Sequence, residues 1–108
     1  MSQLKEVTAK EAAEILKNHP EYKLVDVRED FEREIATIVG SVQLTEELSE
    51  EIIQSWDKST PIIFHCHHGG RSYAAGNYFR EHGFTDISNM TGGIDAWSLE
   101  VDPAVARY

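Results

Sequence analysis

The sequence predicts an α/β fold in which a central, mainly parallel sheet is flanked by helices on both faces. Strand-like and helix-like segments alternate along the chain, and a strand-helix-strand order requires crossover connections. The apolar run at 62–64 suits a strand that is buried on both faces. A length of 108 residues with 41% apolar residues provides for one ordinary hydrophobic core. We therefore expect residues 1–108 to form a single domain.

The first half of the chain begins with a well-marked helix. Thr8 and Glu11 have the spacing of a capping box, which predicts a helix that continues to about Asn18. Residues 23–27 then combine apolar side chains with an aspartate near the end, as in a short strand. The next expected elements are a brief helix over 31–36 capped by Asp30, a weaker strand at 41–44, and a helix from a cap at Thr45 through Trp56.

The second half continues the same alternation. The expected elements are a strand at 62–64, a helix capped by Ser72 and ending near His82, a strand at 87–90, and a short helix after Gly92 and Gly93. In the first of these helices, the small residues 74–76 would let the helix lie close to the sheet, and Tyr78 and Phe79 are expected in the core. Trp97 is expected to anchor the last helix by packing.

Reactive groups in a parallel α/β sheet gather beyond the carboxyl ends of the strands. Three segments of unusual composition fall at such ends. They are residues 26–29, 66–71 and 90–93. Their expected convergence at one edge of the sheet is the first indication of a functional site.

Composition excludes several classes of function. With ten lysines and arginines against nineteen aspartates and glutamates, the net charge is −9, and a chain this acidic is a poor binder of nucleic acid or anionic membranes. No apolar run approaches the about 20 residues that cross a bilayer, and residues 1–6 lack a secretory apolar segment. One cysteine excludes an internal disulfide, a CxxC redox pair and a multi-cysteine zinc site. We expect a cytoplasmic protein without a cofactor, since no dinucleotide or Walker loop is present.

The charge is unevenly distributed. Residues 62–82 carry a net charge of +1 and contain the cysteine and four of the five histidines, whereas both flanking segments are acidic. One interpretation is a small anion pocket in an otherwise acidic protein, and the other is an acidic surface that merely aids solubility. Charge alone does not decide between them.

The loop after the strand at 62–64 carries the chemistry. Cys66 is followed by two histidines, two glycines and Arg71 before the next helix. Glycines let a loop curl and direct successive N–H groups inward, while a helix N-terminus and an arginine add positive potential. These features favour a thiolate and therefore lower the pKa of Cys66. The pattern predicts an activated nucleophile that faces an anionic substrate.

Two alternative roles for the cysteine are less favoured. A lone cysteine after an apolar strand is often a buried, inert residue, but the polar, glycine-rich sequence that follows is unsuited to a buried position. Metal binding by the four consecutive residues 65–68 is disfavoured because neighbouring side chains of an extended segment point in opposite directions. In addition, the sequence shows no second cluster at ligand spacing.

The length of the loop separates two kinds of cysteine chemistry. Cysteine phosphatases have five residues between the cysteine and the arginine, whereas four residues separate Cys66 from Arg71 here. We expect the shorter ring to give a tighter pocket, fit for one additional sulfur atom rather than a tetrahedral phosphoryl group.

The sequence resembles the rhodanese-like sulfurtransferases in their single-domain form. The matching segments are 24–29 (Leu-Val-Asp-Val-Arg-Glu), Gly40, 66–72 (Cys-His-His-Gly-Gly-Arg-Ser) and 92–97 (Gly-Gly-Ile-Asp-Ala-Trp). The order and spacing also agree, and the match covers residues from about 5 to 98. One departure is the segment 37–41, which keeps its glycine but lacks the histidine and proline of the turn common in the family.

The resemblance implies a sheet of about five strands, a domain core at about 5–98 with a short tail, and a mechanism. Cys66 would take the outer sulfur of thiosulfate as a persulfide, release sulfite, and pass the sulfur to cyanide, a small thiol or a protein thiol. Arg71 would attract the anionic donor. The residues implied to bind the substrate, mainly through backbone N–H groups, are His67, His68, Gly69, Gly70, Arg71 and Ser72.

Other roles are assigned differently or stay open. We expect Asp26 and Arg28 to form a structural ion pair, and Gly92 and Gly93 to serve the turn rather than the chemistry. Because Cys66 is the only cysteine, the sulfur must leave to another molecule, so a partner is required. One alternative function is a protein-to-protein sulfur-relay or binding module with incidental thiosulfate activity. A less favoured alternative is a cysteine-dependent phosphatase or arsenate reductase.

Overall fold

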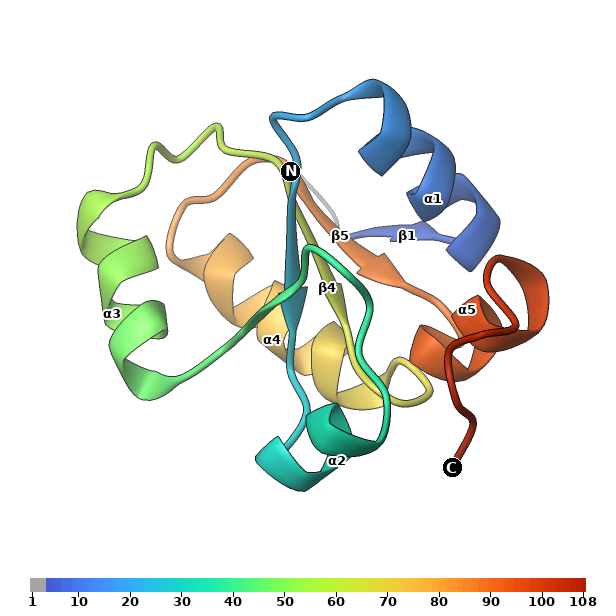
Figure 1. Cartoon of the computed structure of the whole chain (residues 1–108). Helices are drawn as coiled ribbons and strands as arrows, with labels where there is room; N and C mark the ends of the chain where they lie inside the picture. The colour runs from blue at the N-terminus through green and yellow to red at the C-terminus, as the bar shows by residue number, and fades with distance from the viewer. Residues whose placement is uncertain (1–3) are drawn as a thin grey trace.

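Five parallel strands form the centre of the molecule, in the order β1-β5-β4-β2-β3 (Figure 1). The computed structural model describes residues 4–108. The expectation that residues 1–6 form no secretory segment falls in part on residues 1–3, which lie outside the described residues. The strands are β1 (Lys5–Val7), β2 (Lys23–Asp26), β3 (Val42–Gln43), β4 (Ile62–His65) and β5 (Ile87–Met90). The predicted α/β fold with a parallel sheet is confirmed.

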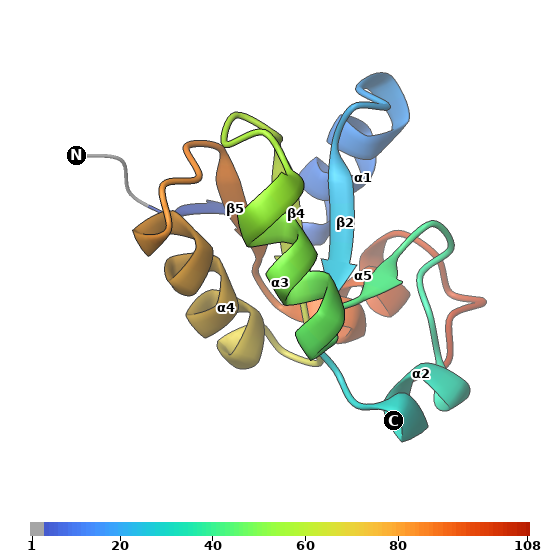
Figure 2. The same cartoon turned by 90° about the vertical axis from the view of Figure 1, so that its left-hand side faces the viewer.

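Helices cover both faces of the sheet. They are α1 (Ala9–Asn18), α2 (Asp30–Ile35), α3 (Glu46–Ser55), α4 (Gly70–Glu81) and α5 (Gly93–Glu100). α1 and α5 lie on one face, α3 and α4 lie on the other, and α2 sits beyond the carboxyl end of β2 (Figures 1 and 2). Among the described residues, no helix is long and apolar enough to cross a membrane.

Each face of the sheet has its own hydrophobic cluster. Leu24 and Ile63 pack with α1 and α5, whereas their neighbours Val25 and Phe64 pack with α3 and α4. Successive side chains of a strand point to opposite faces, so β2 and β4 supply both clusters. All four residues of β4 are buried, and the apolar run at 62–64 predicted this for the first three. The strand that leads to Cys66 is therefore fixed from both sides.

The structure corrects two predicted helix caps. α4 is capped by Gly69 and begins at Gly70, because Gly69 adopts a left-handed conformation with φ of 113° that starts the helix earlier than Ser72. α2 begins at Asp30 itself, and its capping box pairs Glu29 with Glu32. Ser72 is consequently inside the helix, where its side chain is available to the cysteine loop.

The packing of α4 was only partly predicted. Phe79 is fully buried, but Tyr78 is 46% exposed and Ala74 is also exposed, so their predicted inward positions were wrong. Gly76 does lie against the sheet, since a Cβ atom there would come within 2.8 Å of Leu4 and 3.3 Å of Ile87. Helical residues 76 and 79 share one face, whereas residue 78 lies about 100° from residue 79 around the axis.

We expect Phe79→Ala to lower the free energy of unfolding by about 3–5 kcal/mol, because it empties a site in the core. Phe79 stacks on Phe64 with ring centroids 5.3 Å apart. The matched control is Tyr78→Ala, which should cost about 1 kcal/mol or less since the ring is half exposed. Urea unfolding followed by circular dichroism measures both. Equal losses for the two variants would contradict this packing.

Candidate active site

The Cys66 sulfur lies in a ring of hydrogen-bond donors at the carboxyl end of β4. The backbone N–H groups of Gly69 and Ser72 point at Sγ, with donor-to-sulfur distances of 3.1 and 3.4 Å. The Ser72 hydroxyl also lies 3.4 Å from Sγ. This geometry follows from the early start of α4, because the loop and first turn of the helix direct their unpaired N–H groups inward.

A second segment, at the start of α5, supports the loop from behind. The N–H groups of Ile94 and Asp95 donate to the carbonyl oxygens of Cys66 and His67, at 2.9 and 3.2 Å. Gly93 has a positive φ of 58°, and a Cβ atom there would collide with both of these carbonyl groups. This close contact accounts for the structural role predicted for the glycine. The ends of β4 and β5 converge, as the sheet topology predicted.

These donors determine the ionisation of the cysteine. Burial by itself would raise the pKa of Cys66, but the hydroxyl and N–H of Ser72 and the N–H groups of Gly69 and Arg71 outweigh it and lower the pKa. The hydroxyl carries a single hydrogen and also lies 2.5 Å from Asn89 Oδ1. The backbone N–H groups are therefore the permanent donors, and the hydroxyl is shared.

Cys66 is buried, with only 1% of the residue exposed, so the expectation that the sequence after it is unsuited to a buried position was wrong. Its surroundings are nevertheless unlike those of an inert core cysteine, because several polar groups donate to the sulfur. Glu32 binds the side chains of both Arg71 and Tyr108 beside the loop, and Tyr108 stacks on His67. We call these four residues the rim.

Arg71 is engaged by a carboxylate that no sequence pattern assigned to the site. Its guanidinium donates two hydrogen bonds to Glu32, at 2.7 and 2.9 Å. The Tyr108 hydroxyl donates to the same carboxylate at 2.6 Å. Arg71 foremost among these partners holds the pKa of Glu32 far below its ordinary value. The positive charge of Arg71 is thus balanced in this structure, and its predicted role in donor binding stays a prediction.

Asp26 and Arg28 form the expected structural ion pair. Their side chains are fully buried and meet at 2.8 Å, and Arg28 also donates to the carbonyl oxygens of Glu32 and Ala36. Arg33 reaches the same aspartate at 2.6 Å. These bonds tie α2 to the end of β2. Glu32, which is carried by α2, is thereby held in place to receive Arg71.

His65 does not face the rim. Its ring is completely buried, with Nε2 3.8 Å from Asp26. Burial lowers the pKa of His65 to about 4, so the ring is neutral at physiological pH. His65 of β4 therefore packs beside Asp26 of β2 as a structural residue and is not part of a nucleophile or metal site around Cys66.

The segment after α5 returns to the rim, a contact that no sequence pattern indicated. Tyr108 stacks on His67 with ring centroids 4.1 Å apart and planes inclined by 10°. Arg28 donates to the Tyr108 hydroxyl at 3.1 Å, and Arg107 pairs with Asp95 at 2.9 Å. Arg107 is therefore held by α5, and Tyr108 is held by His67 of the cysteine loop and by Arg28.

Comparison with known proteins identifies the family. The family described as Rhodanese-like domain matches residues 8–100. The chain belongs to the rhodanese-like family. It is 29% identical over 97 residues to the thiosulfate sulfurtransferase GlpE of Tolumonas auensis, and the match covers 90% of this chain and 91% of that protein. It is 36% identical over 100 residues to the rhodanese-like/PpiC domain-containing protein 12, chloroplastic, of Arabidopsis thaliana, covering 82% of this chain but 31% of that protein.

Solved structures agree with this assignment. A rhodanese-like domain protein from Staphylococcus aureus superposes with a TM-score of 0.77 at 25% identity, covering 97% of this chain and 99% of that one. A rhodanese-related protein from Thermoplasma volcanium gives 0.72 at 28% identity, with coverage of 96% and 99%. The resemblance seen in the sequence is confirmed, and the family includes proteins named as sulfurtransferases.

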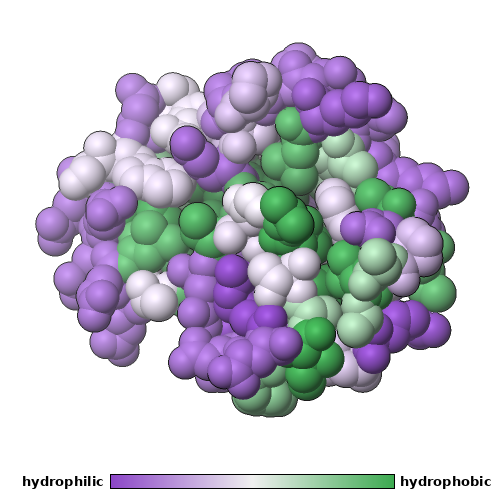
Figure 3. All heavy atoms as spheres, in the orientation of Figure 1, coloured by the Kyte–Doolittle hydropathy of each residue, from purple (hydrophilic) through white to green (hydrophobic). Residues whose placement is uncertain are grey.

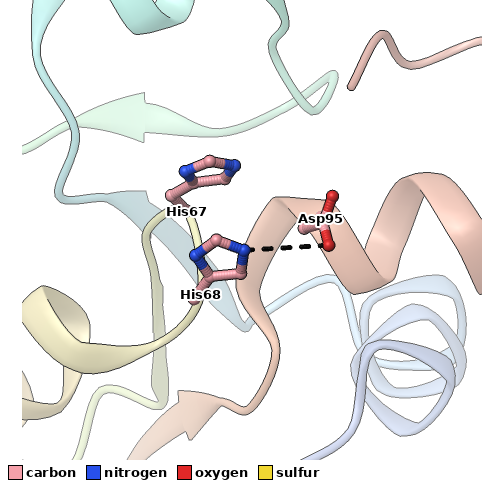
Figure 4. A group of neighbouring side chains, drawn as sticks. All are labelled: His67, His68 and Asp95. Carbon is pink, nitrogen blue, oxygen red and sulfur yellow. Dashed lines mark ion pairs between the residues drawn. The ribbon is translucent and has the colours of Figure 1, made fainter. Parts of the chain in front are cut away.

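Within the rhodanese-like fold, the predicted binding residues separate into two groups. Gly69 and Ser72 are buried and contact the sulfur, whereas the His67 and His68 side chains lie beside Asp95 (Figure 4). Gly70 begins α4 and is exposed. A surface hollow of about 460 Å³ lies elsewhere, between α1 and α5. No site residue lines it.

The lowered pKa of Cys66 has a measurable consequence. The thiolate is the reactive form, so the rate of alkylation by iodoacetamide should rise with pH to a midpoint below 9.0, the ordinary thiol value. Ser72→Ala removes a donor and should move this midpoint upward, while the backbone N–H groups keep part of the effect. A midpoint that is unchanged in the variant would show that the hydroxyl contributes nothing to the thiolate.

Proposed function

We propose that this rhodanese-like protein is a sulfurtransferase that carries a sulfane sulfur on Cys66 as a persulfide. The observation that supports this most directly is the ring of N–H donors around a sulfur whose pKa is lowered despite its burial. Such a ring stabilises the negative charge of a thiolate and, after transfer, that of a persulfide. The substrate class is a small anionic donor such as thiosulfate, or another persulfide.

The first half-reaction loads the cysteine. The Cys66 thiolate attacks the outer sulfur of thiosulfate, a new S–S bond forms, and the S–S bond of the donor breaks. Sulfite leaves with the electron pair of that bond, so that no external oxidant or reductant is needed. The backbone N–H groups of residues 67–72 would receive the charge of the terminal sulfur.

The second half-reaction unloads it. A thiophilic acceptor, such as cyanide or the thiolate of a small molecule or protein, attacks the terminal sulfur and restores the Cys66 thiolate. Cys66 is the only cysteine in the sequence. A resolving cysteine is thus absent from this domain, and the acceptor must come from outside it.

Intact mass spectrometry tests the loading step. Exposure to thiosulfate should raise the mass by one sulfur atom, about 32 Da, because the thiolate gains sulfur without losing a group. Cys66→Ser should show no gain, and cyanide should remove the added mass from the wild-type protein. An unmodified wild-type protein after exposure to thiosulfate and to a small-molecule persulfide would contradict the proposal.

We expect Arg71→Ala to weaken the use of thiosulfate more than it weakens the fold. The loss of a charge-assisted contact to an anionic donor corresponds to a fall in kcat/KM of about tenfold or more. The Arg71–Glu32 pair is partly exposed, so the melting temperature should fall by no more than about 5 °C. Arg71→Lys keeps the charge and should lose less activity. A large fall in melting temperature with intact KM would contradict this role.

A relay between proteins is a second candidate, favoured by the surface beside the site. Large apolar side chains are exposed on α2 and the following segment, which ends at β3, and apolar groups stand among polar ones over the lower part of this face in Figure 3. These residues are Phe31, Ile35, Val39 and Val42. Exposed apolar groups of this kind suit a protein donor or acceptor. Persulfide formation without repeated turnover to cyanide would favour the relay, and phosphate release from an aryl phosphate would favour a phosphatase instead.

A further inference from the structure

Three side chains of types that can bind a metal ion meet beside the cysteine loop. His67 and His68 come from the loop, and Asp95 comes from the first turn of α5 (Figure 4). One potential ligand atom from each lies within 4.8 Å of the other two, and His68 Nε2 is 3.8 Å from Asp95 Oδ2. Figure 4 shows both imidazole rings on the side of the loop that faces Asp95.

A metal site at 65–68 was disfavoured from the sequence, and the structure shows that the main reason does not apply to this loop. That reason assumed an extended segment, in which neighbouring side chains point apart. In the curled loop the rings of His67 and His68 instead stack, with centroids 4.1 Å apart and planes inclined by 26°. The third ligand is 27 residues further along the chain, and only the convergence of the loop and α5 brings it near. His65 and Cys66, the other residues considered, are buried and take no part.

Two imidazoles and one carboxylate form a donor set that suits first-row transition metals such as Zn²⁺ and Ni²⁺. Ligand atoms around a tetrahedral ion with bonds of about 2.1 Å are about 3.4 Å apart. The cluster is therefore within a small side-chain rotation of binding geometry. Such a rotation is available to His68, whose side chain is 69% exposed. His67 Nε2 is buried and has no hydrogen-bond partner among the described residues, so it is not committed to another group.

We propose that His67, His68 and Asp95 bind a divalent transition-metal ion of the zinc or nickel class. In this structure the Asp95 carboxylate is paired with Arg107, which donates to it at 2.9 and 3.3 Å. The ion and the guanidinium compete for the same oxygen atoms. Metal binding consequently releases Arg107 from Asp95 on α5, and by reciprocity removal of Arg107 strengthens metal binding.

The site is separate from the sulfur chemistry. The three ligands are side chains of His67, His68 and Asp95, whereas the Cys66 sulfur faces the N–H groups of Gly69 and Ser72 and is not part of the cluster. The proposal does not rest on the sulfurtransferase activity. Because a thiolate also binds zinc, the test uses Cys66→Ser protein as the background, so that the cysteine cannot supply the signal.

Titration with zinc chloride and nickel chloride, followed by calorimetry and by competition with a chromophoric chelator, tests the site. We expect one ion per chain, and a loss of affinity of about tenfold or more in His68→Gln and in Asp95→Asn. Arg107→Ala should bind about two- to fivefold more tightly, the effect of removing one exposed ion pair. This gain distinguishes the cluster from any histidine elsewhere on the surface.

His19→Gln is the matched control, because His19 is an exposed histidine 3.6 Å from the carboxylate of Glu21 and lies outside the cluster. Its affinity should equal that of the background protein. Absence of binding, binding unchanged in both His68→Gln and Asp95→Asn, or weaker binding in Arg107→Ala would each overturn the proposal. Circular dichroism of every variant establishes that the fold is kept, and His68→Gln alters only an exposed side chain.

Discussion

The hydrogen bonds that the loop backbone donates to the Cys66 sulfur place the strictest demands on the surrounding structure. N–H groups can converge on one atom only if the chain reverses sharply after β4, which Gly69 permits through its left-handed conformation. The carbonyl groups then point outward and require donors of their own, which the start of α5 supplies. The glycine at 93 follows from this contact, since any side chain there would push the loop away.

Charge pairs that lie beyond the loop hold the rim residues in position beside it. The buried pair of Asp26 and Arg28 joins the end of β2 to α2, and α2 carries Glu32 to Arg71. A buried pair of this kind adds little net stability compared with apolar residues of similar size. The pair instead fixes positions. Arg28, held by Asp26, binds α2 and so places Glu32, and Glu32 in turn positions Arg71 of the loop.

The sequence was sufficient for features that local rules govern. The capping box of Thr8, the doubly buried strand at 62–64 and the glycine-rich loop depend on neighbours within a few residues, and each was predicted. The edge strand β1 was missed because three residues with two charged side chains have no strand pattern. The predicted cap at Ser72 was wrong because two glycines precede it, and a glycine can start a helix without a capping side chain.

The parts of the site that the sequence could not supply are contacts across long separations. Glu32 and Arg71 are 39 residues apart, and Tyr108 is 76 residues from Glu32. No local pattern links such residues, and without the fold Glu32 is one acidic residue among nineteen. Asp95, the third residue of the proposed metal site, could not be linked to His67 and His68 for the same reason.

The balanced charges at the rim also bear on the anion pocket that the charge distribution suggested. Arg28 and Arg33 face Asp26, and Arg71 faces Glu32, so each of these cations has a carboxylate partner. A net positive charge on residues 62–82 therefore does not translate into a free positive patch around the cysteine. Arg71 can act on an anionic donor only by sharing or leaving Glu32, so the donors that face the sulfur directly are the backbone N–H groups. Such dipoles act over a short range and in a fixed direction, so they select for an atom that fits the ring rather than for total charge.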